Sequence, residues 1–594
     1  QFAKTWRDHL ERIKLGAANG KVAVIGGGVA GFELALTMGE AIRGTGVIPE
    51  IVVIDRSAPL DGVGPRARGV LMAALAGIGG RVEAGAEVAE ISADHIVLTD
   101  GRQIDTAFCV GVAGAMPHAF NTASGLPLER GFIRVNRYLQ SESAAHIFAS
   151  GDCAHLVETP RPKAGVFAVR AAPVLFKNLR AALAGGAMTA FKPQKTYLKL
   201  ISLGPKSALA ERGKLALSGP FLWRWKDHID QKFMNMVNNL PKMTPPVAPD
   251  QAALGLSDML AEKPLCGGCG AKVGPGVLND GLCQLPLPSR ADVISGPGDD
   301  AAVLEIGGLR QVLTTDHLRA VTDDPAAMVR IAILHAMGDI WSMGAEPQAA
   351  LLSLILSCQS EPLQARVMEE ILTTAQAVLQ AEGAALVGGH TTMGSEMTIG
   401  VTLTGLCGQK VITQDGGKAG DRLILTRPLG SGIILAAEMQ GAARGRDVAA
   451  LLDVMQAPQG RAAAILRGAA TAMTDVTGFG FAGHLGAMAK GAGLSALIYL
   501  ENLPIFAGVQ DLVRAGHGSA LAKSNRAAAP VAGLAEGDWR SAVLHDPQTA
   551  GGLLAAIPAQ KAQEILAALA KEGIEAWEVG EFEAGPEGGM AVRA

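Results

Sequence analysis

Apolar positions in the first 240 residues follow the period of strands and the period of helices in turn. The segment VAVIGGGVAGFELALTMGEAI begins as an apolar run, passes through glycines, and then repeats apolar residues three and four apart. This order predicts a strand, a tight turn and a helix. EIVVID, which ends on Asp55, predicts a second strand, and a long helix is predicted from about residue 165 to residue 183. The first part, residues 1–240, is therefore expected to have an α/β fold.

The residues from about 263 onward mix strand-like and helix-like patterns. Strands are predicted at VLTTDH, AALLSLILS, AALVGGH and MTIGVTLTGL, and a helix is predicted through MVRIAILHAMGDIWSMG. This mixture predicts an α+β fold with a substantial sheet. Between the two parts, residues 241–262 combine prolines with small and polar residues and lack a sustained strand pattern, which indicates a linker.

Composition excludes several classes of protein. A length of 594 residues suits about three or four domains of ~150 residues each. The net charge of −4 and the aromatic content of 4% give no reason to expect a nucleic-acid partner. The seven cysteines are an odd number in mostly apolar surroundings, and no apolar run reaches the ~18 residues of a membrane span. We therefore expect a cytoplasmic protein.

Gly26, Gly28 and Gly31 form a G-x-G-x-x-G turn between the predicted first strand and its helix. Glycines at these positions let the backbone approach a pyrophosphate, and the helix N-terminus supplies unpaired N–H donors. Asp55 ends the second strand, where a carboxylate can accept hydrogen bonds from an adenosine ribose. The alternative is a tight turn that needs glycine for structural reasons alone, but the whole strand–turn–helix–strand–acid order favours a dinucleotide site.

These motifs resemble those of the Rossmann-like pyridine-nucleotide flavoprotein oxidoreductases, particularly the single-subunit NADH dehydrogenases. GGGVAGFELA is similar to their NADH-binding turn and places Glu33 where the family often carries a glutamate near the nicotinamide. IFASGDCAH is similar to their second flavin motif, in which Asp152 would bind the ribityl chain of FAD. The resemblance implies NAD(P)H and FAD as cofactors. The family's earlier glycine turn has no counterpart before residue 21, so we expect the flavin domain to be N-terminally truncated in this sequence. The alternative is a first part that no longer binds FAD.

Residues 215–240 contain two Trp and two Phe among interleaved charges. The pattern is typical of an interfacial helix that rests on a membrane, as in the related dehydrogenases. It is also typical of a terminal helix packed on its own domain. The second interpretation is favoured, and peripheral membrane contact is the alternative.

Two cysteines stand three residues apart in KPLCGGCGAKVGP, residues 263–275. A structural zinc site would need more ligands, and neither a second CxxC nor a histidine pair follows at the usual spacing. A redox dithiol is not favoured, because a linker precedes Cys266 and the pair encloses two glycines. The favoured interpretation is a flexible loop on which Lys272 lies three residues after Cys269 and lowers the pKa of its thiol. Two incidental cysteines near a lysine remain the alternative.

Acidic residues recur in glycine-rich or strand-end contexts in the second part. The clusters PGDDAAV, TTDH, VTDDP, MGDIWSMG and MTDVTGFG contain Asp299, Asp300, Asp316, Asp323, Asp324, Asp339 and Asp475. Any one aspartate of this kind is more often a turn or cap residue. The recurrence instead favours a Mg²⁺–nucleotide site, with the glycine-flanked loop VGGHTT as a source of backbone donors to phosphate. No Walker-type motif is present, so the predicted ATP site has another architecture.

The order of these motifs resembles the selenophosphate synthetases (selenide, water dikinases), which belong to the aminoimidazole ribonucleotide synthetase-like superfamily. The matching motifs are CGAK, DDAAV, TTDH, GDIWSMG, GGHTT, DVTGFGFAGHL and DPQTAGGLL, spread over residues 263–594. The resemblance implies two subdomains, residues 263–425 and 426–594, and a homodimer whose mobile N-terminal loop closes over ATP. It also implies that ATP, selenide and water are converted to selenophosphate, AMP and phosphate.

The same resemblance implies roles for individual residues. Cys269 matches the family's reactive Cys or Sec, and Lys272 matches its essential lysine. Asp300, Asp339 and Asp475 match the carboxylates that bind Mg²⁺. The residues that match ATP-contacting positions are Lys272, Pro297, Gly298, Asp299, Asp316, Asp339, Gly389, His390 and Thr391. Some bacterial members have a second cysteine directly before the lysine, where this chain has Ala271, so Cys266 is left without a role.

The relation between the two parts stays open at this level. The favoured hypothesis is a fusion in which the oxidoreductase supplies reduced selenium to the synthetase. The main alternative is an NADH:acceptor oxidoreductase with a regulatory ATP-binding domain, for which loss of the metal aspartates would be expected. A different ATP enzyme of the superfamily, from purine or thiamine metabolism, is disfavoured because such enzymes lack the Cys–Gly–x–Lys loop. A first part that only docks, without redox chemistry, is a further alternative.

Overall fold

The computed structural model describes residues 2–593 apart from 113, 205, 214, 240–246, 248, 252, 254–255, 257–266, 283–288, 296–297, 409–410 and 536. The chain forms two compact units, Gln1–Met243 and Thr244–Ala594. The predicted linker 241–262 lies almost entirely outside the described residues, and so do Cys266 and Pro297.

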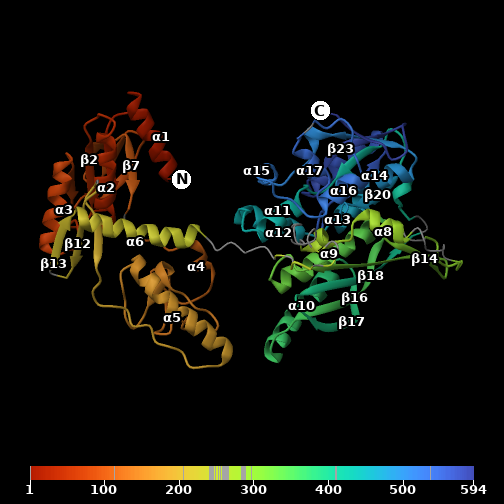
Figure 1. Ribbon diagram of the computed structural model, residues 1–594, viewed down its shortest axis with the longest axis horizontal. Coiled ribbons are helices and arrows are strands. Elements are labelled where there is room, and N and C mark those ends of the chain that lie inside the picture. Colours follow the sequence, from red (N-terminus) through yellow and green to blue (C-terminus); the bar gives the residue numbers. More distant parts are fainter. Residues whose placement is uncertain are drawn as a thin grey trace. The chain divides into compact units, whose positions relative to one another are not determined.

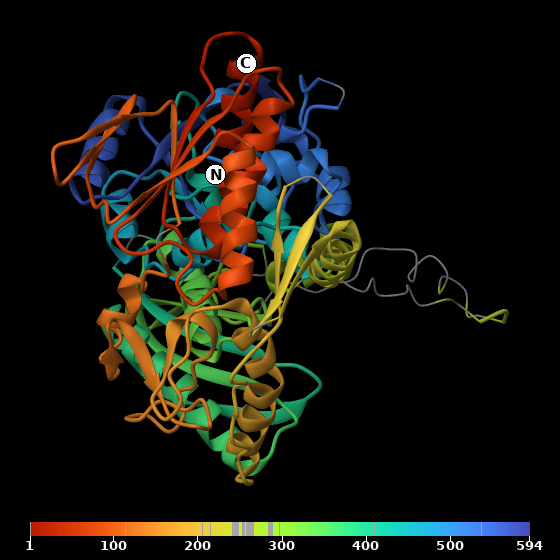
Figure 2. The ribbon, with the colours of Figure 1, turned by 90° about the vertical axis from the view of Figure 1, so that its left-hand side faces the viewer.

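The first unit is built on a four-stranded parallel sheet with the order β3-β2-β1-β7 (Figures 1 and 2). The predicted strand, helix and strand are β1 (Lys21–Ile25), α2 (Val29–Arg43) and β2 (Glu50–Asp55). This layer also includes α1 (Phe2–Lys14), α3 (Pro65–Gly77), β3 (Arg81–Ala84) and β7 (Phe108–Gly111). Helix α2 packs its apolar face on the two central strands, and the core that results is closed to water. The predicted α/β fold is confirmed.

Three small sheets complete the first unit. The antiparallel strands β4 (Val88–Ile91), β5 (His95–Leu98) and β6 (Gln103–Asp105) form one of them. A second contains β8 (Leu128–Glu129), β9 (Phe132–Val135) and β10 (Ala154–Leu156), with α4 (Ala119–Ala123), η1 (Gly151–Cys153) and α5 (Gly165–Ala184) beside it. The third contains β11 (Lys199–Ser202), β12 (Ala208–Arg212) and β13 (Leu215–Gly219). Helix α5 confirms the long helix predicted near residues 165–183.

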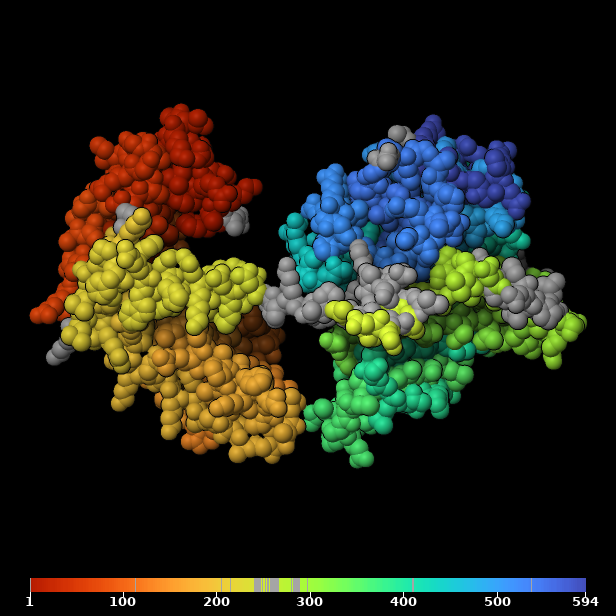
Figure 3. All heavy atoms as spheres, in the orientation of Figure 1, coloured from red at the N-terminus to blue at the C-terminus, as the bar shows by residue number. Residues whose placement is uncertain are grey.

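Helix α6 (Pro220–Asn238) packs on β12 and buries Leu222. Several of its other apolar side chains are exposed at four-residue spacing: Phe221, Trp225, Ile229 and Phe233. The segment that contains this helix is yellow in Figure 3. The helix is therefore attached to its own unit, as the favoured interpretation expects, and keeps an apolar stripe at the surface. Within the described part of the chain, none of the helices has the length and apolar character that crossing a membrane requires.

The first half of the second unit is a five-stranded sheet with the order β14-β15-β18-β16-β17. Its strands are β14 (Ala302–Ile306), β15 (Leu309–Arg319), β16 (Glu346–Ser357), β17 (Ala385–Gly394) and β18 (Thr398–Cys407). Neighbouring strands are antiparallel except β16 and β17. Helices α9 (Pro325–Ser342) and α10 (Glu361–Ala381) pack on the sheet (Figure 1). Alternate residues of β16 are exposed, including Leu351 and Ile355, so the described part of the chain leaves one face of the sheet open.

The second half is a six-stranded sheet with the order β20-β22-β19-β23-β21-β24. Its strands are β19 (Arg422–Leu425), β20 (Ala472–Asp475), β21 (Ser495–Tyr499), β22 (Leu553–Ile557), β23 (Trp577–Glu583) and β24 (Met590–Arg593). Its helices are α11 (Ser431–Met439), α12 (Gly445–Met455), α13 (Gly460–Arg467), α14 (Gly480–Gly491), α15 (Val509–Arg514), α16 (Ala522–Ala528), α17 (Arg540–Leu544) and α18 (Ala559–Lys571). Because β19 pairs with β22 and β23, the subdomain boundary lies before this strand and not after residue 425 as predicted.

Helix α9 is the element that joins the two halves. Fifteen of its 18 residues are buried, and it packs on β15 and β18 on one side and on β20, α12 and α13 on the other. A single hydrophobic core runs through both halves as a result. Short elements around it are η2 (Gly268–Ala271), α8 (Pro275–Leu282), η3 (Gln414–Gly416) and η4 (Leu500–Asn502). Polar residues on α9 are therefore held between two rigid sheets.

Candidate active site

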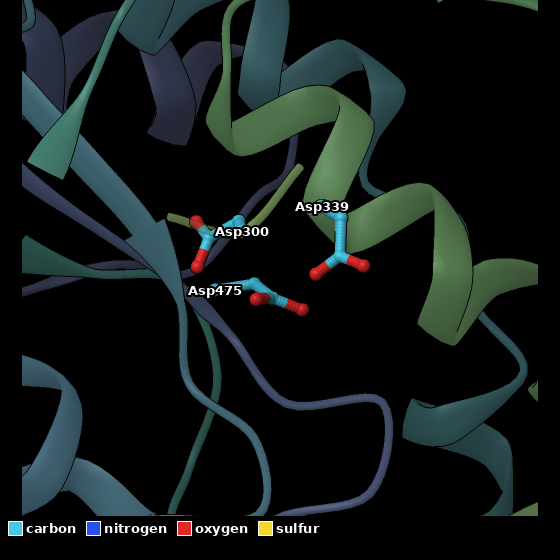
Figure 4. A group of neighbouring side chains, drawn as sticks. All are labelled: Asp300, Asp339 and Asp475. Atoms are coloured by element: carbon cyan, nitrogen blue, oxygen red, sulfur yellow. The ribbon is translucent and has the colours of Figure 1, made fainter. Parts of the chain in front are cut away.

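Three carboxylates from distant parts of the second unit meet at one point (Figure 4). Asp300 precedes β14, Asp339 lies near the C-terminus of α9, and Asp475 ends β20. One oxygen from each lies within 4.8 Å of the others. The structure thus brings together the three residues that the sequence predicts as Mg²⁺ ligands, and both halves of the unit contribute to the group.

The hydrogen bonds around this group leave oxygen atoms for a cation. Asp300 Oδ1 accepts from Thr474 Oγ1 at 2.9 Å and from Gln414 Nε2 at 2.8 Å. Oδ2 of Asp300 and Oδ1 of Asp475 are buried and have no hydrogen-bond partner among the described residues. Buried polar atoms rarely lack a partner, and hard divalent cations take carboxylate oxygens as ligands. The residues present therefore fit Mg²⁺.

The pKa values of the three carboxyl groups also indicate that a cation would stabilise this site. Burial raises the pKa of Asp300 to about 7, and the neighbouring Asp299 adds to this shift. Burial and the other carboxylates raise the pKa of Asp339 and of Asp475 well above the usual range, although Thr314 Oγ1 donates to Asp339 Oδ2 at 2.5 Å. A bound divalent cation would lower these pKa values by compensating the repulsion.

A buried histidine on α14 orients Asp300 through a threonine. The backbone N–H of Thr477 donates to Nε2 of His484 at 3.1 Å, so the neutral ring carries its proton on Nδ1. Nδ1 lies 3.3 Å from Thr474 Oγ1, and the Thr474 hydroxyl donates to Asp300. Burial lowers the pKa of His484 to about 3, which keeps the ring neutral. Sequence reasoning missed this residue, because a histidine among apolar helix positions is usually a satisfied core residue.

Cys269 lies in the η2 turn and is fully buried. Its N–H donates to Thr549 Oγ1 at 3.2 Å, and its Sγ lies 3.3 Å from Nε2 of His335. Gly268 has a φ of +57°, and a β-carbon there would come 2.5 Å from Thr549 Oγ1, so this turn requires glycine. Burial raises the pKa of the thiol to about 12, although Lys272 opposes the shift. The prediction of a lowered thiol pKa is therefore wrong, because burial outweighs the ammonium.

Lys272 connects the cysteine turn to the acidic group. Its Nζ lies 3.4 Å from Asp316 Oδ1 on β15, and the charge of Asp316 contributes, after burial and Asp475, to the raised pKa of Asp339. Burial disfavours the ammonium, but the charges of Cys269 and Asp316 outweigh it and raise the pKa of Lys272. Burial likewise opposes ionisation of Asp316, whose pKa is nevertheless lowered by His335 and Lys272. This pair is thus a charged lysine and a charged aspartate.

The remaining predicted ATP contacts divide into two places. Gly298 and Asp299 adjoin the acidic group, and Asp299 Oδ1 accepts the N–H of Asp300 at 2.9 Å. The segment 389–391 lies within β17 and not in a loop, because it pairs with β16 in a regular parallel ladder. Among the described residues, no side-chain hydrogen bond or ion pair links this segment to the acidic group. As an edge strand, β17 has one side without a neighbouring strand among the residues that the structure describes.

One predicted acidic cluster takes no part in the group. Asp324 caps the N-terminus of α9, where its side chain accepts the N–H of Ala327 at 2.9 Å. Asp323 is exposed beside it. The VTDDP cluster is therefore a helix cap, which is the common role of such aspartates.

In the first unit the predicted turn residues converge at the carboxyl end of β1 and β2. Gly26 has a φ of +117°, and a β-carbon at Gly31 would come 1.9 Å from the carbonyl oxygen of Gly26. Gly28 precedes α2, and a β-carbon there would have no atom of the described residues within 4 Å. Asp55 Oδ2 accepts the N–H of Gly27 at 2.6 Å. Glycines packed this closely at a helix N-terminus are what a dinucleotide-binding turn requires.

The other two predicted cofactor residues of the first unit lie in different surroundings. Glu33 Oε1 accepts the N–H of Ser202 at 2.6 Å and lies 3.9 Å from Lys226 Nζ, so it ties α2 to β11 and α6. Burial raises the pKa of Glu33. Asp152 lines a small, partly open pocket together with Lys163 and Phe167. Asp152 thus lies at this pocket, whereas the Glu33 carboxylate is engaged in structural contacts.

Comparison with known proteins assigns each unit to a class. Residues 2–172 match the pyridine nucleotide-disulphide oxidoreductase family model. Residues 298–407 and 418–593 match the N-terminal and C-terminal domains of AIR synthase related proteins. The first unit is therefore an oxidoreductase domain of Rossmann-like type, and the second has the AIR synthase-related fold, as the sequence predicts.

Within that class, the chain belongs to the selenide, water dikinase family. It is 36% identical over 342 residues to the selenide, water dikinase of Myxococcus xanthus (strain DK1622), which covers 55% of this chain and 96% of that protein. It is also 36% identical over 324 residues to that of Geobacter metallireducens, covering 53% of this chain and 93% of that protein. The predicted family resemblance is confirmed.

Similar solved structures include a thiamine-monophosphate kinase from Stenotrophomonas maltophilia K279a, with a TM-score of 0.40 and 22% identity over 51% of this chain and 92% of that one. Another is the E. coli hydrogenase maturation protein HypE, with a TM-score of 0.36 and 20% identity over 52% of this chain and 91% of that one.

Proposed function

We propose that the second unit synthesises selenophosphate from ATP, selenide and water, with release of AMP and phosphate. Membership of the selenide, water dikinase family supports this. The observation that carries the proposal is a series of close polar contacts that leads from the sulfur to Asp316, beside the acidic group. Cys269 Sγ lies 3.3 Å from His335 Nε2, which lies 3.6 Å from Asp316 Oδ2, and Lys272 Nζ lies 3.4 Å from Asp316 Oδ1. Burial raises the pKa of Asp339 in the acidic group, and the charges of Asp475 and Asp316 add to this shift. A soft nucleophile and a cation thus lie beside a site suited to a metal-bound triphosphate.

The residues of the site have different roles in this reaction. Asp300, Asp339 and Asp475 would hold Mg²⁺, which neutralises the charge of the triphosphate when bound. Lys272 stabilises negative charge on the phosphoryl group in transfer, since Asp316 holds its ammonium in place. Cys269 offers the softest side-chain atom available as a contact for selenide. Because this sulfur is fully buried, the η2 turn has to open for selenide to reach it.

We assign ATP to the residues next to the acidic group and to the edge strand of the first sheet. These residues are Lys272, Pro297, Gly298, Asp299, Asp316, Asp339, Gly389, His390 and Thr391. Apolar side chains exposed on or near this sheet support a homodimer through its open face; they include Leu351 at 45%, Val387 at 62% and Met393 at 63% exposed. A second copy on this face would bring β17 next to a partner surface.

For the first unit we propose an NAD(P)H-dependent oxidoreductase module that uses FAD and supplies reduced selenium. The glycine turn at Gly26–Gly31 supports a nicotinamide dinucleotide, and the match of residues 2–172 to the pyridine nucleotide-disulphide oxidoreductase model, with Asp152 in the second flavin motif, supports the flavin. Hydride from NADH would convert elemental selenium to hydroselenide, and NAD⁺ would be the other product. A second candidate function, favoured by the same turn, is an NADH:acceptor oxidoreductase whose second unit is regulatory.

The test measures AMP made by the intact chain with ATP and Mg²⁺, with and without selenide. Wild type should form AMP only with selenide, Asp475→Asn should form none, and Asp323→Asn, at an exposed position outside the group, should match wild type. NADH should matter only when elemental selenium replaces selenide. NADH oxidation without any selenide-dependent AMP would favour the regulatory alternative instead.

A further inference from the structure

A buried histidine faces the sulfur that the proposed reaction uses. His335 lies in the middle of α9, and its side chain is 0% exposed. Its Nε2 lies 3.3 Å from Cys269 Sγ and 3.6 Å from Asp316 Oδ2. Because α9 is held between the two sheets, this ring is fixed beside the cysteine turn.

The other ring nitrogen defines the tautomer. The backbone N–H of Ala550 is directed at Nδ1 of His335 at 3.3 Å. A backbone N–H can only donate, so Nδ1 is the acceptor and the neutral ring carries its proton on Nε2. The Nε2–H group is therefore the one that faces Cys269 and Asp316.

Burial keeps the ring neutral among several charged and titratable groups. They are Cys269 in η2, Lys272 directly after it, Asp316 on β15 and His484 on α14. Burial lowers the pKa of His335 to about 4; Asp316 opposes this shift and Lys272 adds to it. At neutral pH the ring is thus a hydrogen-bond donor to its surroundings and carries no charge.

We propose that His335 is a positioning residue for Cys269, whose sulfur accepts a hydrogen bond from Nε2–H and is thereby favoured as a thiolate. Hydrogen bonds to a charged acceptor are stronger than those to a neutral one, so the contact favours ionisation in a site where burial opposes it. Since Nε2 already holds a proton, His335 does not take the thiol proton, which passes to solvent. The role in selenophosphate synthesis rests on the proposed function, whereas the contact with the sulfur does not.

Three variants separate this role from a structural one. His335→Leu removes both nitrogens at a similar volume, while His335→Asn and His335→Gln each keep an amide N–H donor. We measure alkylation of Cys269 by iodoacetamide across pH by mass spectrometry, with the exposed Cys358 as internal control. His335→Leu should slow labelling of Cys269 about tenfold at neutral pH and shift its profile upward by about one pH unit. The two amide variants should stay within about threefold of wild type, and Cys358 should be unchanged in all.

The rate of selenide-dependent AMP formation should fall in the same variants in which alkylation of Cys269 slows. His335→Leu should lower kcat for selenide-dependent AMP formation about tenfold or more and leave the KM for ATP within about twofold. An unchanged Cys269 profile in His335→Leu, or equal loss in all three variants, would overturn the proposal. If the wild type forms no selenide-dependent AMP but the alkylation shift appears, the proposed function fails and the contact is supported.

A measurement on the wild type covers the case in which His335→Leu does not fold. Nitrogen-15 NMR of labelled imidazole should show His335 as the neutral Nε2–H tautomer from about pH 8 down to about pH 5. A Nδ1–H tautomer, or protonation of the ring above about pH 6, would overturn the proposal.

Discussion

Asp339 on α9 and Asp475 at the end of β20 face each other across the two halves of the second unit, in a group whose nearest oxygens lie within 4.8 Å. The two residues are separated by 136 positions, and the shared core alone brings them together. Burial and mutual repulsion raise the pKa of both. The halves therefore join at a point that is electrostatically unfavourable until a cation binds.

Mg²⁺ should consequently stabilise the second unit. Binding to the folded state alone adds about 2.7 kcal/mol to the free energy of unfolding at a hundredfold excess over Kd. Asp475→Asn removes a buried repulsive charge, so it should raise stability without Mg²⁺ and abolish the gain with Mg²⁺. Thermal unfolding with EDTA and with Mg²⁺ checks this, with Asp323→Asn as the matched control. An Asp475→Asn protein that Mg²⁺ stabilises as much as wild type would contradict the metal assignment.

The two cysteines of the KPLCGGCGAK segment should differ in importance. Cys269→Ala should abolish selenide-dependent AMP formation, because it removes the sulfur that faces Lys272 and His335. Cys266→Ala should leave most of the activity. Both variants are assayed at the same saturating ATP, and equal loss in the two would instead favour a redox role for the CxxC pair.

Alanine substitutions at two glycines of the first unit should distinguish an effect on folding from an effect on dinucleotide binding. A β-carbon at Gly31 would come 1.9 Å from Gly26 O, so Gly31→Ala should destabilise the unit. No atom of the described residues lies within 4 Å of a β-carbon at Gly28, so Gly28→Ala should fold normally and weaken NADH binding by obstructing the pyrophosphate. NADH titration and thermal unfolding of both variants check this. Unchanged NADH affinity in Gly28→Ala would argue against a dinucleotide at this turn.

Sequence patterns were sufficient to predict the main helices and the class of protein, but not how deeply each site residue is buried. The apolar periods predicted α2, α5 and α9 well, because each buries a regular face. The family motifs identified the three carboxylates, whose convergence depends on contacts over more than 100 residues. Burial cannot be inferred from neighbours in sequence, so the direction of the Cys269 thiol pKa shift was predicted wrongly.

The missed residues share one physical reason. His335 and His484 each lie inside an apolar helix, where a histidine gives no local signal of function. What distinguishes them is a backbone N–H from another element, Ala550 and Thr477 respectively, which determines the tautomer. The segment 389–391 was predicted as a loop because of its glycines, yet its pairing with β16 makes it a strand.

Stability should depend on pH through Asp546, which lies in the DPQTAGG segment. Burial raises the pKa of this carboxyl to about 8, although the N–H of Ile433 donates to it at 3.1 Å. Between about pH 4 and pH 8 the folded state binds one more proton here than the unfolded state, so this group makes the free energy of unfolding fall as pH rises. Asp546→Asn should therefore gain stability relative to wild type from pH 5 to pH 8. Urea unfolding of both proteins at these two pH values measures the difference, and a constant difference would contradict the pKa shift.

The central claim is that the second unit couples ATP to selenide. Phosphorus-31 NMR of the intact chain with ATP, Mg²⁺ and selenide tests it most directly. The account predicts equal amounts of selenophosphate, orthophosphate and AMP, with none formed when selenide is omitted. Formation of ADP, or ATP hydrolysis at the same rate without selenide, would contradict it.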